Sequence, residues 1–199
     1  MKLSLDDIVD LRAYERERES FRAAIIELKK KRRVHVGPVV TFLFENAATI
    51  RFQIQEMARA EKIITDEGIE TELRIYNPLI SEPGGLAATM FIELTSDDEL
   101  REWLPKLAGV ERQIELRFGD PAVPIVVRSQ LDAEHEKQLT RESVTASVHY
   151  VNFSLGVEQV ARFDEGPVIL AVTHPAYEHS TELAPETVAE LASDLRNGA

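Results

Sequence analysis

Apolar residues recur at three- and four-residue spacing through the first part of the chain. This spacing predicts an amphipathic helix over 6–33, broken near Ser20. A second long helix is predicted over 45–67, where Asn46 is a suitable N-cap and Gly68 a suitable C-terminal stop. The stripe of the first helix consists of Leu11, Tyr14, Phe21, Ile25 and Leu28.

Later runs of alternating or β-branched residues predict strands. The run at 34–44 is bent by a Gly-Pro pair, and strands at 70–76 and 86–94 predict a long-looped hairpin. Hairpin-like spacings favour a mostly antiparallel sheet over parallel crossover units, so we expect one α+β domain over 1–199. Further strands are expected at 113–118, 125–128, 144–153, 167–173 and 178–183, with helices over 97–107 and from Pro185.

Composition and charge narrow the possible partners. The 199 residues include no cysteine, which excludes a cysteine-ligated cluster or a thiolate zinc site within this chain. A net charge of −12 disfavours nucleic acid and anionic membranes, leaving a protein or a small molecule as the expected partner. Acidic residues from Asp6 onward predict no export signal, hence a cytoplasmic protein. The polar stretch 129–143 is expected to be a surface excursion or a mobile loop.

Five consecutive cations over 29–33 end the predicted first helix. Cations at a helix C-terminus complement the macrodipole, and we prefer this structural interpretation. The alternative is that the run grips phosphate or an acidic partner. A lone run without interleaved aromatic residues is a poor nucleic-acid site.

The second helix carries the candidate acid–base residues. Projection at 100° per residue puts Glu61 near the middle of its apolar stripe and Gln53 at the margin, so Glu61 is expected to be partly buried. A buried carboxylate needs a partner, which is either an arginine of the first helix or a functional site. In the functional alternative, Glu61 and Gln53 face a pocket with Glu45 or Glu56, and desolvation raises a carboxylate pKa.

Two histidines are candidate metal ligands, although no local metal-binding motif is present. His149 lies within the predicted strand VTASVHYVNF, and His174 closes the strand VILAVT. If those strands pair, the histidines could approach each other and bind a metal with a distant carboxylate. Otherwise, backbone groups or solvent satisfy them.

A predicted loop offers a candidate ligand-binding mouth. Tyr76 and Asn77 end a predicted strand, and Gly84 and Gly85 lie across the loop. Turn formation explains the same residues, so both interpretations stay open. Tyr177 is a further candidate for binding. Nucleotide-binding glycine motifs and the Gly-x-Ser-x-Gly elbow are absent from the sequence.

Whole phrases of the chain resemble an uncharacterised bacterial family, domain of unknown function 3501. They are KKKRRV at 29–34, LFEN at 43–46, QIQEMARAEKI at 53–63, YNPLI at 76–80, SVHY at 147–150 and HPAY at 174–177. The resemblance implies no activity. The genes of this family often lie beside those for rubrerythrin-like di-iron proteins and for iron–sulfur proteins, which implies a redox or oxidative-stress setting.

Two hypotheses for function follow. The first is an accessory or binding protein that docks onto such a redox partner through its acidic surface and the loops around Tyr76 and His174. The second is a metal-dependent or acid–base enzyme that uses a cavity of carboxylates and histidines. Convergence of the side chains would distinguish them. A homodimer built on the first helix is compatible with either. The enzyme candidates are Glu45, Gln53, Glu56 and Glu61 with His149 and His174.

Overall fold

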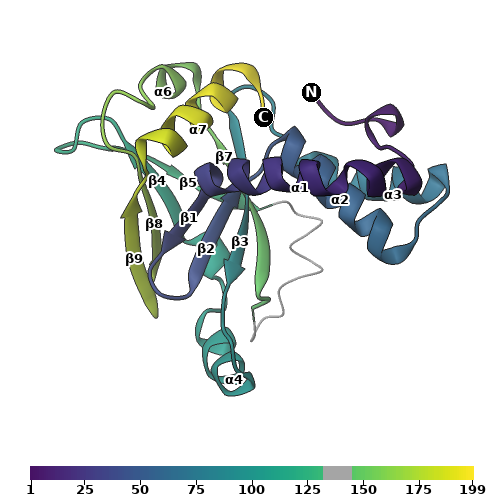
Figure 1. Cartoon of the computed structure of the whole chain (residues 1–199). Coiled ribbons are helices and arrows are strands. Elements are labelled where there is room, and N and C mark those ends of the chain that lie inside the picture. The colour runs from purple at the N-terminus through teal and green to yellow at the C-terminus, as the bar shows by residue number, and fades with distance from the viewer. Residues whose placement is uncertain (132–144) are drawn as a thin grey trace.

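The computed structural model of the chain describes residues 1–131 and 145–199. In these residues two antiparallel sheets pack face to face, and helices cover the outer face of one of them (Figure 1). Sheet A has the order β1-β2-β3-β7-β6 and sheet B the order β5-β4-β8-β9. The α+β prediction is confirmed. The strands are β1 Arg33–Val36, β2 Val40–Phe44, β3 Gly85–Ile92, β4 Ile114–Phe118, β5 Ile125–Arg128, β6 Gln130–Leu131, β7 Val148–Ser154, β8 Ile169–His174 and β9 Tyr177–Glu182.

The predicted single strand over 34–44 is a hairpin. Strands β1 and β2 pair through Val36 and Val40, on either side of a tight turn. Gly37 in this turn has φ of 71°, and a Cβ atom there would lie 2.5 Å from the Tyr177 hydroxyl oxygen. Only glycine therefore allows the hairpin to approach sheet B this closely.

Alternate residues of the sheets form the larger hydrophobic core between them. Phe42, Met90 and Val151 from sheet A meet Leu116 and Leu170 from sheet B, and all five side chains are buried. Because side chains alternate across a strand, the neighbouring residues of β2, β3 and β7 point to the opposite face of sheet A. That outer face is where the helices pack.

The first long helix is continuous. Helix α1 begins after Asp10, whose side chain accepts hydrogen bonds from the backbone N–H groups of Arg12 and Ala13. The predicted break near Ser20 is wrong, because the Ser20 hydroxyl bonds the Glu17 carbonyl without interrupting the helix. The helices are η1 Leu5–Asp7, α1 Leu11–Arg32, α2 Ala47–Glu61, α3 Asp66–Tyr76, η2 Asn77–Leu79, α4 Asp97–Lys106, η3 Val110–Arg112, α6 Val157–Ala161 and α7 Pro185–Asn197.

The segment after α2 corrects the predicted hairpin. The expected strand over 70–76 is part of helix α3, which Thr65 caps by accepting the Gly68 N–H. Gly68 therefore lies in the first turn of α3 and does not stop α2. Helix α2 ends earlier, where Lys62 adopts the left-handed conformation with φ of 56°.

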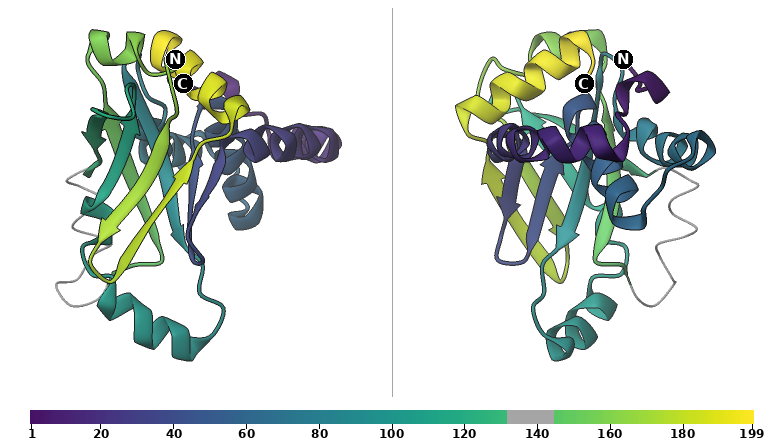
Figure 2. Two further views of the ribbon diagram at one scale, coloured as in Figure 1. Left: turned by 90° about the vertical axis from the view of Figure 1, so that its left-hand side faces the viewer. Right: turned by 45° about the vertical axis from the view of Figure 1, so that its right-hand side comes forward.

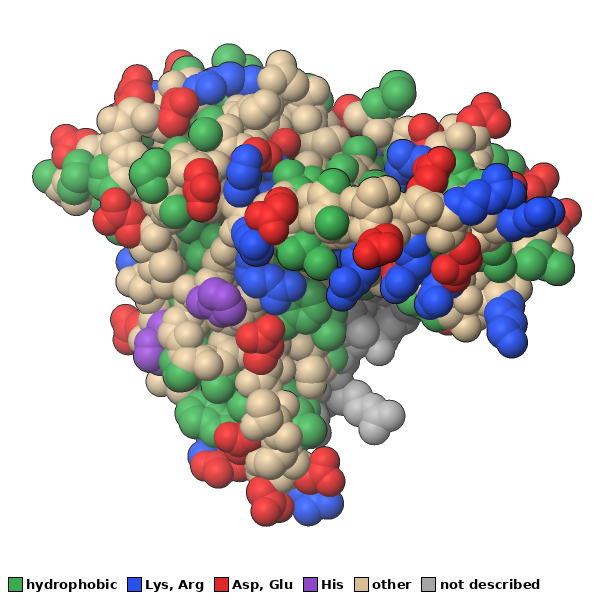
Figure 3. Space-filling model, viewed as in Figure 1, with side chains coloured by type: hydrophobic (Ala, Val, Ile, Leu, Met, Phe, Trp, Pro, Cys, Tyr) green, Lys and Arg blue, Asp and Glu red, His purple; other side chains and the backbone are tan. Residues whose placement is uncertain are grey.

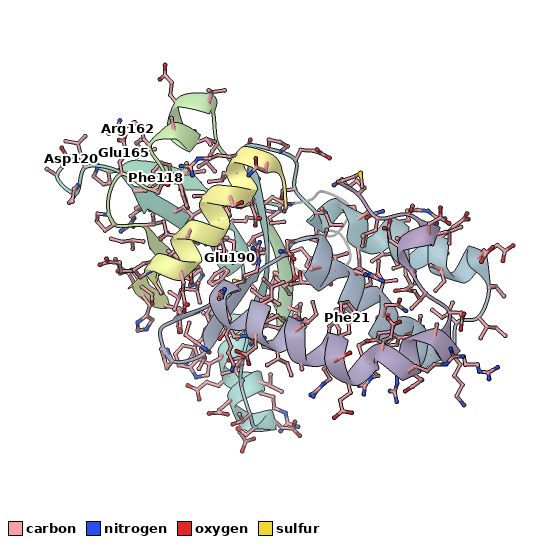
Figure 4. The ribbon with its side chains drawn as sticks, turned by 45° about the horizontal axis from the view of Figure 1, so that its top comes forward. Phe21, Phe118, Asp120, Arg162, Glu165 and Glu190 are labelled. Carbon is pink, nitrogen blue, oxygen red and sulfur yellow. The ribbon has the colours of Figure 1, made fainter. Side chains whose placement is uncertain are left out.

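Helices α1, α2 and α3 form a layer over the outer face of sheet A, as the two views in Figure 2 show. A smaller hydrophobic core lies beneath them, built on Ile50, Ile54 and Leu73. Between α1 and α2, the Phe21 and Phe52 rings meet edge to face with centroids 5.9 Å apart (Figure 4). In the described part of the chain, no helix is long and apolar enough to cross a membrane.

Both ends of the chain are tied to residues 77–81, which comprise η2 and the two residues after it. The Asn77 amide donates to the Leu3 carbonyl oxygen and accepts the Leu3 N–H. At the other end, the Ala199 N–H donates to the Ser81 carbonyl oxygen. The two termini consequently lie close together (Figures 1 and 2).

Of the predicted surface excursion at 129–143, residues 132–143 lie outside the described residues. Residues 130 and 131 form the short edge strand β6, which pairs with β7.

Candidate functional site

A cavity of about 280 Å³ lies between the outer face of sheet A and the helices that cover it. Its lining comes from five segments that are separated in the sequence and that only the fold brings together. The buried floor is joined by half-buried side chains nearer the rim. The cavity is lined by Lys29, Arg33, Leu43, Glu45, Thr49, Ile50, Gln53, Tyr76, Leu79, Thr89, Phe91, Val148 and Tyr150.

Glu45 supplies the buried carboxylate of this cavity. It follows β2 directly, precedes the N-cap of α2, and is 7% exposed. Two hydroxyls donate to it: that of Thr89 on β3 reaches Oε1 at 2.7 Å, and that of Thr49 on α2 reaches Oε2 at 2.5 Å. These charge-assisted hydrogen bonds hold the carboxylate in a fixed orientation.

Helix α2 places two of these residues by its own periodicity. Asn46 caps the helix by accepting the Thr49 N–H, and Thr49 and Gln53 then lie one turn apart on the same side. Tyr76, from the end of α3, forms a hydrogen bond with Gln53. Burial raises the pKa of Tyr76, and this hydrogen bond partly offsets the rise. Burial also raises the pKa of Tyr150, on β7, to about 12. Both phenols are therefore neutral at pH 7.

Two cations from the end of α1 complete the lining. The Lys29 ammonium lies 5.1 Å from the centroid of the Phe52 ring, and the Arg33 guanidinium lies 5.7 Å from that of Phe91. Burial lowers the pKa of Lys29, and the charge of Glu45 partly offsets that shift. Of the five consecutive cations, the first and the last, Lys29 and Arg33, therefore face the cavity.

Arg32, between them, fixes the backbone of the site. Its side chain is fully buried, and its guanidinium donates to the carbonyl oxygens of Phe44 and Glu45. It also forms ion pairs with Asp194 and, at 3.1 Å, with Glu190 on α7. Figure 4 shows Glu190 on the side of α7 that faces the end of α1. Burial raises the pKa of Asp194, and Arg32 opposes the rise.

The arrangement combines an oriented carboxylate, two neutral phenols, an amide and two cations around an apolar wall. Convergent polar side chains interspersed with apolar ones, as in this lining, can fix the orientation of a small molecule. The groups present can form hydrogen bonds and ion pairs with a ligand. The hydroxyls of Thr49 and Thr89 donate to Glu45, so its two oxygens serve as acceptors at the floor of the cavity.

Two other predicted carboxylates lie away from the cavity. Glu56 accepts two hydrogen bonds from Arg18 and one from the Tyr14 hydroxyl, all between α1 and α2. These partners lower the pKa of Glu56, chiefly through Arg18. Glu61 is exposed at the last residue of α2, so its predicted burial is wrong. An arginine of the first helix was expected to pair with Glu61. Arg18 pairs instead with Glu56, five residues earlier on α2.

The two histidines belong to different sheets. His149 lies on β7 and His174 on β8, and these strands do not pair. His149 Nε2 lies 2.7 Å from the Thr145 hydroxyl and 2.9 Å from the Ala146 carbonyl oxygen. His174 Nε2 lies 3.3 Å from the Ala108 carbonyl oxygen. Within residues 1–131 and 145–199, no three His, Asp or Glu side chains cluster in a way that could hold a metal ion.

Two of the three predicted binding residues have structural contacts. Asn77 binds the backbone of Leu3, and Tyr177 is 3% exposed. The Tyr177 hydroxyl donates to the Val36 carbonyl oxygen and accepts the N–H groups of Val39 and Val40. Of the three, Tyr76 alone lines the cavity, where it forms a hydrogen bond with Gln53.

Sequence reasoning missed Thr89, Tyr150, Lys29 and Arg33 as site residues. A usable signal existed for the cations, because a phosphate- or acid-binding role was one alternative for the run. Thr89 and Tyr150 carry no local signal. Their pairing across β3 and β7 becomes evident only when the strand register is known.

Comparison with known proteins gives a family without an assigned activity. The model of the family described as "Protein of unknown function (DUF3501)" matches residues 2–195. A crystal structure of a novel protein of unknown function from Burkholderia pseudomallei K96243 has a TM-score of 0.90 and 34% sequence identity, covering 98% of this chain and 100% of that one. No curated protein matches the chain. The chain belongs to the DUF3501 family.

Proposed function

We propose that this chain is a small-molecule-binding protein whose ligand occupies the cavity on the outer face of sheet A. The observation that carries the proposal is the Glu45 carboxylate, buried at the floor and oriented by Thr49 and Thr89. Burying a carboxylate is costly unless it is hydrogen-bonded, and a purely structural layer would be better served by an apolar side chain.

The convergence of polar side chains from separate elements supports the same conclusion. Gln53 and Tyr76 belong to α2 and α3, while Tyr150 comes from β7. Apolar residues such as Leu79 and Val148 fill the spaces between them. The volume of about 280 Å³ lies just below the usual range of ligand pockets, roughly 300 to 1,000 Å³, which suits a ligand smaller than a drug-sized molecule.

A pair of tryptophan substitutions on α2 tests the proposal. Gln53→Trp places an indole at the half-buried rim of the cavity, whereas Glu61→Trp adds the same ring at an exposed position. We expect ligand-observed NMR of a fragment library to find compounds that bind the wild type and Glu61→Trp but not Gln53→Trp. Binding that survives Gln53→Trp, or a library without any binder, would contradict the proposal.

The alternatives from the sequence stay predictions. Docking onto a rubrerythrin-like or iron–sulfur partner in the cytoplasm rests on the family resemblance, and of its contact candidates His174 is only 8% exposed. A homodimer on α1 would have to use residues beside the stripe, because Tyr14, Phe21 and Ile25 already pack within the chain. The acid–base enzyme would use the same cavity through Glu45.

A further inference from the structure

We infer that the cavity selects a small organic monoanion, a carboxylate that also carries a hydroxyl or an uncharged aromatic amino group. Lys29 and Arg33 bind its negative group, and Glu45 accepts the hydrogen bond of its donor. This inference deepens the proposed function and rests on it.

Among the described residues, half-buried Lys29 forms no direct ion pair, and the charge of Glu45 acts on it from across the cavity. By contrast, its neighbour Lys30 pairs with Glu27 at 2.7 Å and Arg32 pairs with Asp194. Its contact with the Phe52 ring is a cation–π interaction, which supplies no acceptor for the three ammonium donors. An anion in the cavity would supply that acceptor.

Arg33 extends the positive region along the same wall. It lies over the Phe91 ring and forms one long ion pair, at 3.6 Å, with the exposed Glu93. A guanidinium carries five N–H donors, so most of them remain available to the cavity. Arginine beside an aromatic ring is well suited to bind the planar carboxylate of a ligand.

The charge balance indicates a single negative charge on the ligand. Lys29 and Arg33 contribute +2 and Glu45 contributes −1, so the lining carries +1 in a chain whose net charge is −12. In Figure 3, Lys and Arg side chains gather along the lower flank of α1, and Asp and Glu side chains are scattered over the whole face. A monoanion neutralises the lining, whereas a dianion would be repelled by Glu45.

Glu45 sets the second requirement. A carboxylate offers about four acceptor positions, and hydroxyls of Thr49 and Thr89 take one on each oxygen. The remaining positions suit an O–H or N–H group of the ligand. Between the two polar ends, the wall is formed by Leu43, Ile50, Leu79, Phe91 and Val148, which suits a short hydrocarbon or aromatic body.

Matched carboxylates and amides test the inference on the full chain. The probes are small hydroxy- and aromatic amino-carboxylates, such as 4-hydroxybenzoate, each paired with its neutral primary amide, and phenyl phosphate serves as the dianion. We expect NMR titration at pH 7 to give dissociation constants at least about tenfold lower for the carboxylates, equivalent to about 1.4 kcal/mol.

Substitution of one lysine at a time links the preference to the site. Lys29→Met keeps the apolar stem and removes the charge, so it should abolish the preference for carboxylates over amides. Lys30→Met, one residue along on an exposed side chain, should leave it unchanged. If Lys29→Met fails to fold, ¹³C-methylation of the wild-type lysines gives a second readout, because a bound carboxylate should raise the pKa of Lys29.

The outcomes separate this inference from the proposed function. Amides or phenyl phosphate that bind as well as the carboxylates, and lose binding in Gln53→Trp, would overturn the monoanion inference and leave the cavity as a binding site. Carboxylate binding that is indifferent to Lys29→Met would also overturn it. If no compound of any class binds, both the inference and the proposed function fail.

Discussion

The two faces of sheet A come from the same three strands and differ in how their buried polar groups are satisfied. On the inner face, Phe42 and Met90 pack into the core between the sheets, and the polar His149 bonds Thr145 and a backbone carbonyl. On the outer face, Glu45 and Thr89 border a cavity. Under the proposed function, stability depends mainly on the inner face and ligand binding on the outer face, so the two should be separable by mutation.

The largest expected effect is on the inner face. Phe42→Ala removes a fully buried ring and leaves a void, so it should lower the free energy of unfolding by about 3 to 5 kcal/mol. Phe91→Ala, on the half-buried outer face of the neighbouring strand, should cost only about 1 kcal/mol. Urea denaturation of both variants measures the difference. Equal losses would show that the two faces do not differ in this way.

A somewhat smaller loss in the free energy of unfolding is expected at Arg32, which joins the end of α1 to α7. Arg32→Met leaves Asp194 buried without its partner, and we expect a cost of about 3 kcal/mol. The value lies at the low end for buried pairs because Asp194, whose pKa is already raised by burial, can take up a proton. Asp194→Asn in the same variant should restore part of the loss. Thermal and urea unfolding of the single and double variants test this coupling.

Substitution of Tyr177 and of Tyr76 by phenylalanine compares a structural hydroxyl with one that lines the cavity. Tyr177→Phe leaves the buried N–H groups of Val39 and Val40 without their acceptor, which should cost about 1 to 3 kcal/mol. Tyr76→Phe, at the cavity rim, should change the free energy of unfolding less and ligand affinity more. Unfolding and ligand titration of both variants provide the check. A ligand-binding defect in Tyr177→Phe at unchanged stability would contradict the assignment of Tyr177 to a structural role.

The smallest effect is a pH dependence in the helical layer. Arg18 and Tyr14 hold the pKa of Glu56 below its usual value of 4.5, so the folded state keeps this carboxylate ionised to lower pH than the unfolded state does. Its contribution to stability is therefore present above pH 4.5 and is lost as pH falls through the lowered pKa. Glu56→Gln should be less stable than the wild type above pH 4.5, with the gap closing in acid, whereas Glu19→Gln, at an exposed position, should show no gap at any pH.

Much of the fold was predictable where capping chemistry is local. Asn46, Ser96 and Pro185 begin helices at the expected places because each satisfies or removes donors of the first turn. Helix α3 was missed because the alternating letters from 70 to 76 masked the helical spacing of Ile69, Leu73 and Tyr76. The end of α2 carried no signal, since a lysine occupies the left-handed position where glycine is usual.

The candidate site was only partly predictable, for a related reason. Glu45, Gln53 and Tyr76 were identified from segments near one another in the sequence, and the structure brings all three to one cavity. Glu61 was wrongly predicted to be buried because the angular argument ignored its position at the last residue of α2. The contribution of Thr89 depends on β2 and β3 pairing in a particular register, which a single sequence does not encode locally.

Residues 77–81 hold both ends of the polypeptide, because Asn77 binds Leu3 and Ser81 binds Ala199. The distance between the two ends therefore reports whether these contacts are intact. Fluorophores attached near residues 2 and 199 would transfer energy efficiently in the native state. The transfer would be lost when either the Leu3–Asn77 or the Ala199–Ser81 contact breaks. Such a labelled protein would follow detachment of the ends separately from melting of the sheets. For the same reason, a domain fused to either end would lie beside the helical layer, at a defined site on the native surface.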